Sequence, residues 1–306
     1  MLESETKREI LTYSRMGKSV DSIAKHLHIN KRTIYKTLSA KKRILILADL
    51  HCGHRAGLTP SEWHYQSDNP DKAKWVKQQK ECWDWYVGDM EMLKPIDILF
   101  FLGDAIDGDG KKNNGIELIE PDRNEQVKMA VQCLQVPQAP KIVMVRGTGY
   151  HTGQSEDYED LIARELSAKA IVKIGDHEWP IVNGITFDLK HKTSKTILPY
   201  TQGTSLCKDK LLNLLWHERD GQPNAQVLLR GHIHTYHESG DEDYKAISCP
   251  ALQGWGSRYG ARECSGIVKF GYIWCDVHEG VEISDLLFHP RISKLSCHKL
   301  DVGYEL

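Results

Sequence analysis

The sequence predicts an α/β body preceded by a small all-α segment, and three observations lead to this fold class. Between residues 43 and 234, continuous apolar runs of strand length recur, and each ends in Gly, Asp or His. Segments with helical character lie between these runs, as in an alternating α/β chain. The first 40 residues contain no such run. A chain of 306 residues can hold one large domain and a small one, so we predict domains over 1–40 and 41–306.

The first 40 residues are expected to fold as three short helices. Gly17 can end the first helix, and Ser19 and Asn30 can cap the second and the third. Ile23 and Leu27 lie four residues apart and share one face of the second helix. The predicted helices span residues 5–16, 19–27 and 31–38.

This head is strongly basic. Residues 1–43 hold eleven Lys and Arg residues against four Asp and Glu residues, whereas the rest of the chain has an acidic excess. A basic head on an acidic body is what a separate polyanion-binding segment would produce. The run from Asp21 to Leu38 also resembles the helix-turn-helix of resolvases and transcription regulators. A three-helix bundle used for packing or dimerisation is the alternative. The resemblance implies that the third helix enters the major groove of DNA and presents Lys31, Arg32, Thr33, Tyr35 and Lys36 to bases and phosphates.

The body is expected to alternate buried strands with helices. Strands are predicted over 43–49, 97–104, 141–148, 184–191 and 225–234, with helices over 124–135 and 159–169. Residues 244–252 and 266–283 read as further strands that complete a second sheet, with a turn at His278–Gly280. In open α/β sheets, ligands bind beyond the carboxyl ends of the strands. In this sequence, Asp and His side chains, which can bind metal ions, follow the predicted strand ends.

Six acidic and imidazole side chains form the candidate metal centre: Asp49, His51, Asp104, His191, His232 and His234. Asp49 and His51 stand two residues apart, so both side chains are expected on one side of their strand end. Asp104 follows Gly103, and its carboxylate can bridge two ions. Mixed carboxylate and imidazole ligands suit Mn first, with Fe, Zn or Co as alternatives, rather than Ca. Two such ions about 3.5–4 Å apart would hold a phosphoryl oxygen and lower the pKa of a bridging water.

The order of these groups is similar to that of the calcineurin-like metallophosphoesterase superfamily. The shared motifs are D-x-H from Asp49, G-D-x-x-D from Gly103, a lone His191 and G-H-x-H from Gly231, over roughly residues 43–240. The resemblance implies a four-layer α/β/β/α sandwich. It also implies that Asp107 supports a ligand rather than binding metal itself. One metal would be held by Asp49, His51, Asp104 and His234, and the second by Asp104, His191 and His232.

The third motif departs from the family pattern. The family has G-N-H-E or G-N-H-D, whereas this chain has Gly147-Thr148-Gly149-Tyr150-His151. Thr148 stands where the Asn ligand is expected, and a neutral hydroxyl is a weak ligand. We expect His151 to be the leaving-group acid, or else a replacement ligand of the second metal. A weakened second site in a slow or inactive enzyme is the alternative. The variant resembles phage- and prophage-type members of the superfamily.

Three functions follow from these features. The first is a nuclease-like hydrolase that cleaves phosphodiester bonds in DNA and is targeted by its head. The second is a phosphomonoesterase acting on nucleotides or phosphoproteins, and the third is a DNA-binding protein with a degenerate catalytic body. We favour the first because a DNA substrate explains both halves of the chain.

Several negative features predict a cytoplasmic protein, in the bacterial host cytosol if it is phage-encoded. The sequence has no apolar stretch of membrane-spanning length, no secretory leader and no C-x-x-C pair among its eight cysteines. Five histidines are expected to be structural: His54, His64, His177, His217 and His237. Basic and aromatic loop residues are further candidates for substrate contact: Lys190, Lys192, Lys195, Arg258 and Tyr259.

Overall fold

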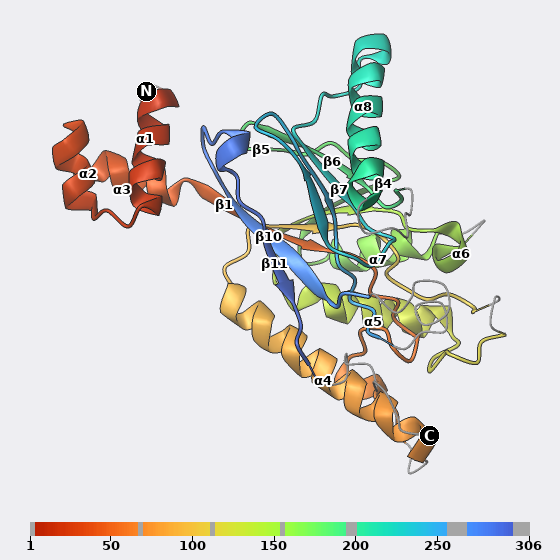
Figure 1. Cartoon of the computed structure of the whole chain (residues 1–306). Coiled ribbons are helices and arrows are strands. Elements are labelled where there is room, and N and C mark those ends of the chain that lie inside the picture. The colour runs from red at the N-terminus through yellow and green to blue at the C-terminus, as the bar shows by residue number, and fades with distance from the viewer. Residues whose placement is uncertain are drawn as a thin grey trace, which may run out of the picture.

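A computed structural model describes residues 4–66, 70–110, 114–153, 157–193, 201–255 and 268–295. Within these ranges the chain forms a three-helix head followed by a body in which two β-sheets lie between outer helices (Figure 1).

The head consists of α1 (Ser4–Arg15), α2 (Val20–Leu27) and α3 (Lys31–Ser39). Its small core is made by one isoleucine from each helix: Ile10, Ile23 and Ile34. The side chains of Ser19 and Asn30 accept hydrogen bonds from the first turns of α2 and α3, which are the two caps expected from the sequence.

The first sheet has six strands in the order β11-β10-β1-β2-β3-β4. The four strands β1 to β4 run parallel, and β10 joins the other side of β1 in the antiparallel direction. Their bounds are β1 Lys41–Leu47, β2 Ile98–Phe101, β3 Lys141–Val145, β4 Ile171–Gly175, β10 Gly271–His278 and β11 His289–Ile292.

The second sheet has five strands in the order β5-β6-β7-β9-β8. The strands β6, β7 and β9 run parallel at its centre. Their bounds are β5 Ile181–Val182, β6 Ile185–Lys190, β7 Val227–Arg230, β8 His237–Gly240 and β9 Lys245–Ser248.

The layers follow from the alternation of side chains along the strands. In β1, Ile44 and Ile46 enter the core between the sheets, whereas Leu45 and Leu47 enter the core beneath the helices of the first sheet. The second sheet is covered by α8, so the body is a four-layer α/β/β/α sandwich, as expected. The covering helices are α4 (Pro70–Leu93), α5 (Arg123–Gln135), α7 (Tyr158–Leu166) and α8 (Gln202–Asp220). Short helical turns are η1 (Ser61–Trp63), α6 (Gly149–Thr152) and η4 (Ile283–Asp285).

The expected placement of the C-terminal strands is partly wrong. Strand β9 lies in the second sheet, but β10 pairs with β1 in the first sheet, and η4 follows it in place of a further strand. Ile273, Cys275 and Val277 of β10 are buried between the sheets, whereas Asp276 on the other face accepts hydrogen bonds from Lys41 and Arg43 of β1. Side-chain contacts with β1 therefore accompany the backbone pairing.

The head is joined to the body through a single residue, Ala40, between α3 and β1. Two basic side chains of α1 also contact the body. Lys7 Nζ lies 2.7 Å from Glu279 Oε1, and Arg8 Nε lies 3.6 Å from Asp285 Oδ2. Part of the basic charge of the head therefore faces acidic groups of the body.

Two further features of the described ranges concern membrane-spanning helices and disulfide bonds. None of the helices there combines the length and the apolar character that a bilayer crossing needs. None of the six cysteines in those ranges forms a disulfide.

Candidate metal centre

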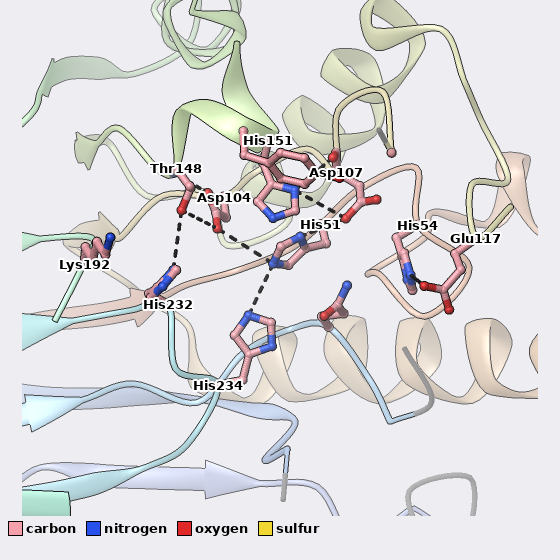
Figure 2. Close-up of a pocket in the computed structure, with 13 residues that line it drawn as sticks. His51, His54, Asp104, Asp107, Glu117, Thr148, His151, Lys192, His232 and His234 are labelled. Atoms are coloured by element: carbon pink, nitrogen blue, oxygen red, sulfur yellow. Dashed lines mark hydrogen bonds and ion pairs between the residues drawn. The ribbon is translucent and has the colours of Figure 1, made fainter. Parts of the chain in front are cut away.

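Loops that follow four strands bring the six expected side chains together. Asp49 and His51 follow β1, Asp104 follows β2, His191 follows β6, and His232 and His234 follow β7. Figure 2 shows His51, Asp104, His232 and His234 pointing toward one another at the end of the sheets.

The first group is formed by Asp49, His51 and His234, whose ligand atoms all lie within 4.8 Å of one another. The Nε2 atoms of His51 and His234 are 3.3 Å apart, and His234 Nε2 lies 3.4 Å from Asp49 Oδ1. The Asp49 and His51 side chains are buried. Buried imidazole nitrogens that face each other beside a carboxylate suit a shared cation.

The second group is formed by Asp104, His191 and His232, again within 4.8 Å of one another. Asp104 Oδ2 lies 3.1 Å from His191 Nε2 and 4.0 Å from His51 Nε2 of the first group. Asp104 therefore belongs to the second group and also approaches His51 of the first.

The loops hold most of these residues in an uncommon backbone conformation. Five of the six have positive φ: 55° at Asp49, 47° at His51, 56° at Asp104, 73° at His232 and 54° at His234. Residues with a Cβ rarely adopt this region, at a cost of order 1–3 kcal/mol each, and such strain gathers at functional sites. Asp49 and His51 do lie on one side, as expected, but β1 ends at Leu47, so the loop backbone and not strand alternation turns both side chains inward.

Two glycines let the loops after β2 and β3 approach closely. A Cβ on Gly103 would lie 2.6 Å from the Cα of Gly147, and a Cβ on Gly147 would lie 2.2 Å from Asp104 Oδ1. Both distances are too short for a side chain, so the position of Asp104 depends on these glycines.

Hydrogen bonds fix the histidine rings from behind. His191 Nδ1 lies 2.6 Å from the Leu102 carbonyl oxygen, and His51 Nδ1 lies 3.1 Å from Asp107 Oδ1. Each ring thereby presents its Nε2 to the centre, as metal-ligating histidines commonly do. Asp107 lies behind His51, and its carboxylate also forms a third group with His51 and His151 in which all ligand atoms lie within 4.8 Å of one another.

The electrostatics of the buried groups favour a cation. Burial by itself would raise the pKa of Asp104, but the charge of His191 and its hydrogen bond hold that pKa well below the ordinary range. Burial by itself would lower the pKa of His191, but Asp104 raises it to about 10. Burial and the neighbouring His191 lower the pKa of His232 to about 4, so that imidazole is a neutral donor. The ionised Asp104 therefore attracts a proton to His191, and a divalent transition-metal ion bound there would take the place of that proton.

Thr148 and His151, the two residues considered in place of the family's Asn ligand, occupy different positions beside the centre. Thr148 Oγ1 lies 3.2 Å from His191 Nε2 and 3.4 Å from His232 Nδ1, so it borders the second group. His151, on the one-turn helix α6, lies on the other side, where its Nδ1 is 2.9 Å from the Asp107 carbonyl oxygen. Its ring centroid is 4.6 Å from that of His51.

The centre opens into a pocket of about 340 Å³. His54 is buried and its Nδ1 accepts a hydrogen bond from Ala56 N at 3.0 Å, which agrees with a structural role, but it also lines this pocket with its Nε2 3.7 Å from Glu117 Oε2. Lys192 lines it as expected, whereas Lys195, Arg258 and Tyr259 lie outside the described residues. Further lining residues that the sequence did not indicate are Glu117, Tyr150 and Gln253.

Three other histidines form hydrogen bonds with residues of the same chain. His64 Nε2 lies 2.9 Å from the Thr59 carbonyl oxygen. His177 pairs with Asp188 at 2.8 Å, and His217 contacts the Gln222 carbonyl oxygen at 2.7 Å. These contacts agree with a structural role.

Glu159 is a further residue beneath the centre that sequence reasoning missed. It is fully buried, and its carboxylate accepts hydrogen bonds from Ala105 N at 2.9 Å and from Gly147 N at 2.6 Å. It thus ties together the loops after β2 and β3. Burial raises its pKa to about 8. No motif surrounds it, since its partners are backbone groups.

The candidate DNA contacts lie on the outer side of α3. Arg32, Tyr35 and Lys36 are exposed, and Tyr35 is 60% exposed. Lys31 is exposed as well and forms an ion pair with Asp21. Thr33 is half-buried.

Comparisons with known proteins give likenesses of structure only. No protein-family model and no curated protein match the sequence. An archaeal phosphodiesterase is 10% identical with a TM-score of 0.42, and a Vps29 mutant from Entamoeba histolytica is 10% identical with a TM-score of 0.41. Each match covers 82% of this chain and 99% of the other. A predicted phosphoesterase from Streptococcus pneumoniae is 13% identical with a TM-score of 0.33, over 82% of this chain and 99% of the other. At such values, function has to be argued from the site itself.

Proposed function

We propose that this protein is a metal-dependent hydrolase that cleaves phosphodiester bonds, with DNA as its substrate. The observation that carries the proposal is a pair of adjoining, largely buried Asp/His groups beside one pocket, with Asp104 of the second group 4.0 Å from His51 of the first. Two adjoining groups of this composition suit two divalent ions, which is an arrangement that hydrolyses phosphate esters.

The residues divide between two metal positions. When bound, divalent ions would polarise phosphoryl oxygens and lower the pKa of the attacking water, and Mn²⁺ is our first candidate. Thr148 borders the second position and offers a neutral oxygen there. The first position would be held by Asp49, His51, Asp104 and His234, and the second by Asp104, His191 and His232.

His151 is suited to protonate the leaving oxygen. Its Nδ1 donates a hydrogen bond to the Asp107 carbonyl oxygen at 2.9 Å, which leaves Nε2 for the substrate. The Asp107 carboxylate lies 3.6 Å from the same Nδ1. General acid catalysis of this kind contributes roughly a hundredfold or more.

The head supports DNA as the substrate class. The outer side of α3 exposes Arg32, Tyr35 and Lys36, a combination that suits phosphates and bases. Lys192 adds a cation to the wall of the pocket. A DNA substrate accounts for the basic head and for the hydrolytic centre together.

The decisive experiment offers the full chain with Mn²⁺ a set of substrates: a small phosphodiester, a phosphomonoester, and labelled single- and double-stranded DNA. Cleavage of DNA and of the diester supports the proposal. Turnover of the monoester alone would favour a phosphomonoesterase, and no turnover with any divalent metal would leave a DNA-binding protein. Asp104→Asn should abolish activity, whereas Asp84→Asn, an exposed residue of α4, should not.

The targeting role of the head needs its own comparison. Replacing Arg32 and Tyr35 by Ala should slow the cleavage of DNA while leaving the small diester unaffected. Lys25→Ala, an exposed residue of α2, is the matched control for loss of surface charge. Equal rates on DNA for the parent and the double variant would show that the outer side of α3 does not engage the substrate.

A further inference from the structure

Helix α8 turns polar side chains toward the body. Lys210 and Asn213 are buried on its inner side, where Lys210 Nζ donates to the Asn224 side chain at 2.9 Å and to the Ala225 carbonyl oxygen at 2.7 Å. The Asn213 amide donates to the Pro223 carbonyl oxygen at 2.9 Å and accepts from Ala225 N at 3.0 Å. Hydrogen bonds to the segment before β7 therefore attach much of the inner face of this helix to the body.

The outer side of α8 is apolar. Its exposed fractions are 57% for Leu211, 38% for Leu212, 39% for Leu214, 54% for Leu215 and 43% for Trp216. A surface helix ordinarily has the opposite arrangement, with apolar residues toward the core. Leu211 and Leu215, four residues apart on one line of the helix, are the most exposed, and exposed apolar residues that gather on one element suit an interaction site. We call these five residues the α8 face.

The α8 face is its own complement under a two-fold rotation. The residues of the LLNLL run are symmetric about Asn213, so Leu211 of one helix would meet Leu215 of an antiparallel copy. Lys208 and Glu218, both exposed, extend the same stripe by one turn at each end. They are also equally distant from Asn213, so an antiparallel copy sets Lys208 opposite Glu218 twice. A parallel copy would instead set like charges opposite each other.

We propose that the α8 face is the interface of a two-fold homodimer in which two α8 helices pack antiparallel and cross near Asn213. Leucines with Trp216 form the apolar centre, and the Lys208–Glu218 pairs form the polar rim that fixes the direction. This inference does not rest on the proposed enzymatic activity. The described residues that line the catalytic pocket include none from α8, so a dimer of this kind leaves the pocket open.

The mass of the full chain in solution tests the interface. Light scattering over a dilution series should give twice the chain mass of 34.9 kDa for the parent protein. Leu215→Glu should give a single chain mass with an unchanged circular dichroism spectrum. The matched control is Met92→Glu on α4, which is 73% exposed and should stay dimeric. A monomeric parent, or a Leu215→Glu variant that remains dimeric, would overturn the proposal.

Charge exchange tests the antiparallel direction. Lys208→Glu alone and Glu218→Lys alone should each raise the dissociation constant of the dimer roughly tenfold, because two favourable pairs become two like-charge contacts. The double variant, with both changes, should restore the parent value. Two single variants with unchanged affinity, or a double variant that is not restored, would exclude this pairing.

Discussion

At the residue scale, the side chains of the centre have separable tasks. Asp104 belongs to the second Asp/His group and approaches the first, whereas Thr148 and His151 lie on opposite sides of it. The sequence left two chemical roles open for His151, and an acid and a metal ligand respond differently to the leaving group of the substrate.

His151→Ala should affect esters according to their leaving group. With a poor leaving group, such as the sugar oxygen of DNA, the rate should fall roughly a hundredfold, since no side chain protonates the departing oxygen. With a nitrophenyl ester, whose leaving group needs no proton, the rate should change little. Steady-state rates on both substrates and a Mn²⁺ titration measure this. Equal losses on both esters together with weaker metal binding would instead make His151 a ligand.

At the scale of elements, the centre depends on how closely the loops after β2 and β3 approach. Glu159 ties the two loops through backbone hydrogen bonds, and Gly147 lets them touch. The strands themselves only bring the loops to one edge. The loop backbones then aim the ligands, as the positive φ values of the ligand residues indicate.

Gly147→Ala should displace Asp104, because the new Cβ would lie 2.2 Å from its Oδ1. We expect metal affinity and turnover to fall by at least about tenfold, as when a supporting contact of a ligand is lost. Gly149→Ala is the matched control in the same loop, since its Cβ would meet nothing within 4 Å. Calorimetric titration with metal measures the affinity of both variants. Equal affinities would contradict the prediction that Asp104 depends on the close approach of the two loops.

The pairing of β1 with β10 carries a pH-dependent contribution to stability. Burial by itself would raise the pKa of Asp276, but hydrogen bonds from Arg43 and Lys41 outweigh it and hold that pKa below 3.8. A depressed folded-state pKa stabilises the fold above the unfolded value, and this contribution is lost as the pH falls through the folded value. Asp276→Asn should therefore lower the free energy of unfolding near neutral pH, with the difference shrinking below about pH 4. Urea denaturation at several pH values measures this, and a difference that is constant with pH would refute it.

At the scale of the whole molecule, the head and α8 lie apart on the body (Figure 1). A dimer formed through α8 would therefore leave each head and each pocket accessible. The head is held against the body by the direct connection of α3 to β1 and by the Lys7–Glu279 and Arg8–Asp285 pairs. DNA bound to α3 would consequently stay close to the same chain.

DNA affinity of the full chain should fall linearly with the logarithm of salt concentration, since bound phosphates release counterions. Arg32→Ala should reduce that slope by about one, because an exposed cation of α3 is lost. Lys7→Ala should leave the slope unchanged, because Lys7 is already paired with Glu279. Fluorescence anisotropy of a labelled duplex over a salt series gives the three slopes. An unaltered slope for Arg32→Ala would place the DNA elsewhere.

Much of the fold could be predicted because its signals are local. Runs such as 43–49 are apolar throughout because each strand of a two-layer core is covered on both faces, and Ser19 and Asn30 cap neighbouring turns. Helix α8 was not predicted, since it buries Lys210 and Asn213 and exposes four of its five leucines. Prediction from hydrophobic periodicity expects apolar residues on the buried side of a helix, and α8 has polar residues there.

By itself, the sequence determined the alternating α/β body and the three-helix head, because periodicity and capping are properties of short segments. The four-layer arrangement and the six candidate side chains were implied by the order of the motifs and its resemblance to a known superfamily. Only the tertiary structure decided that β10 joins β1, that His54 and Glu117 reach the pocket, and that Thr148 and His151 lie on opposite sides of Asp104. These positions depend on backbone turns and on contacts between residues far apart in the chain. Backbone turns and long-range contacts produce no periodic pattern in the amino-acid sequence, so they could not be predicted from it.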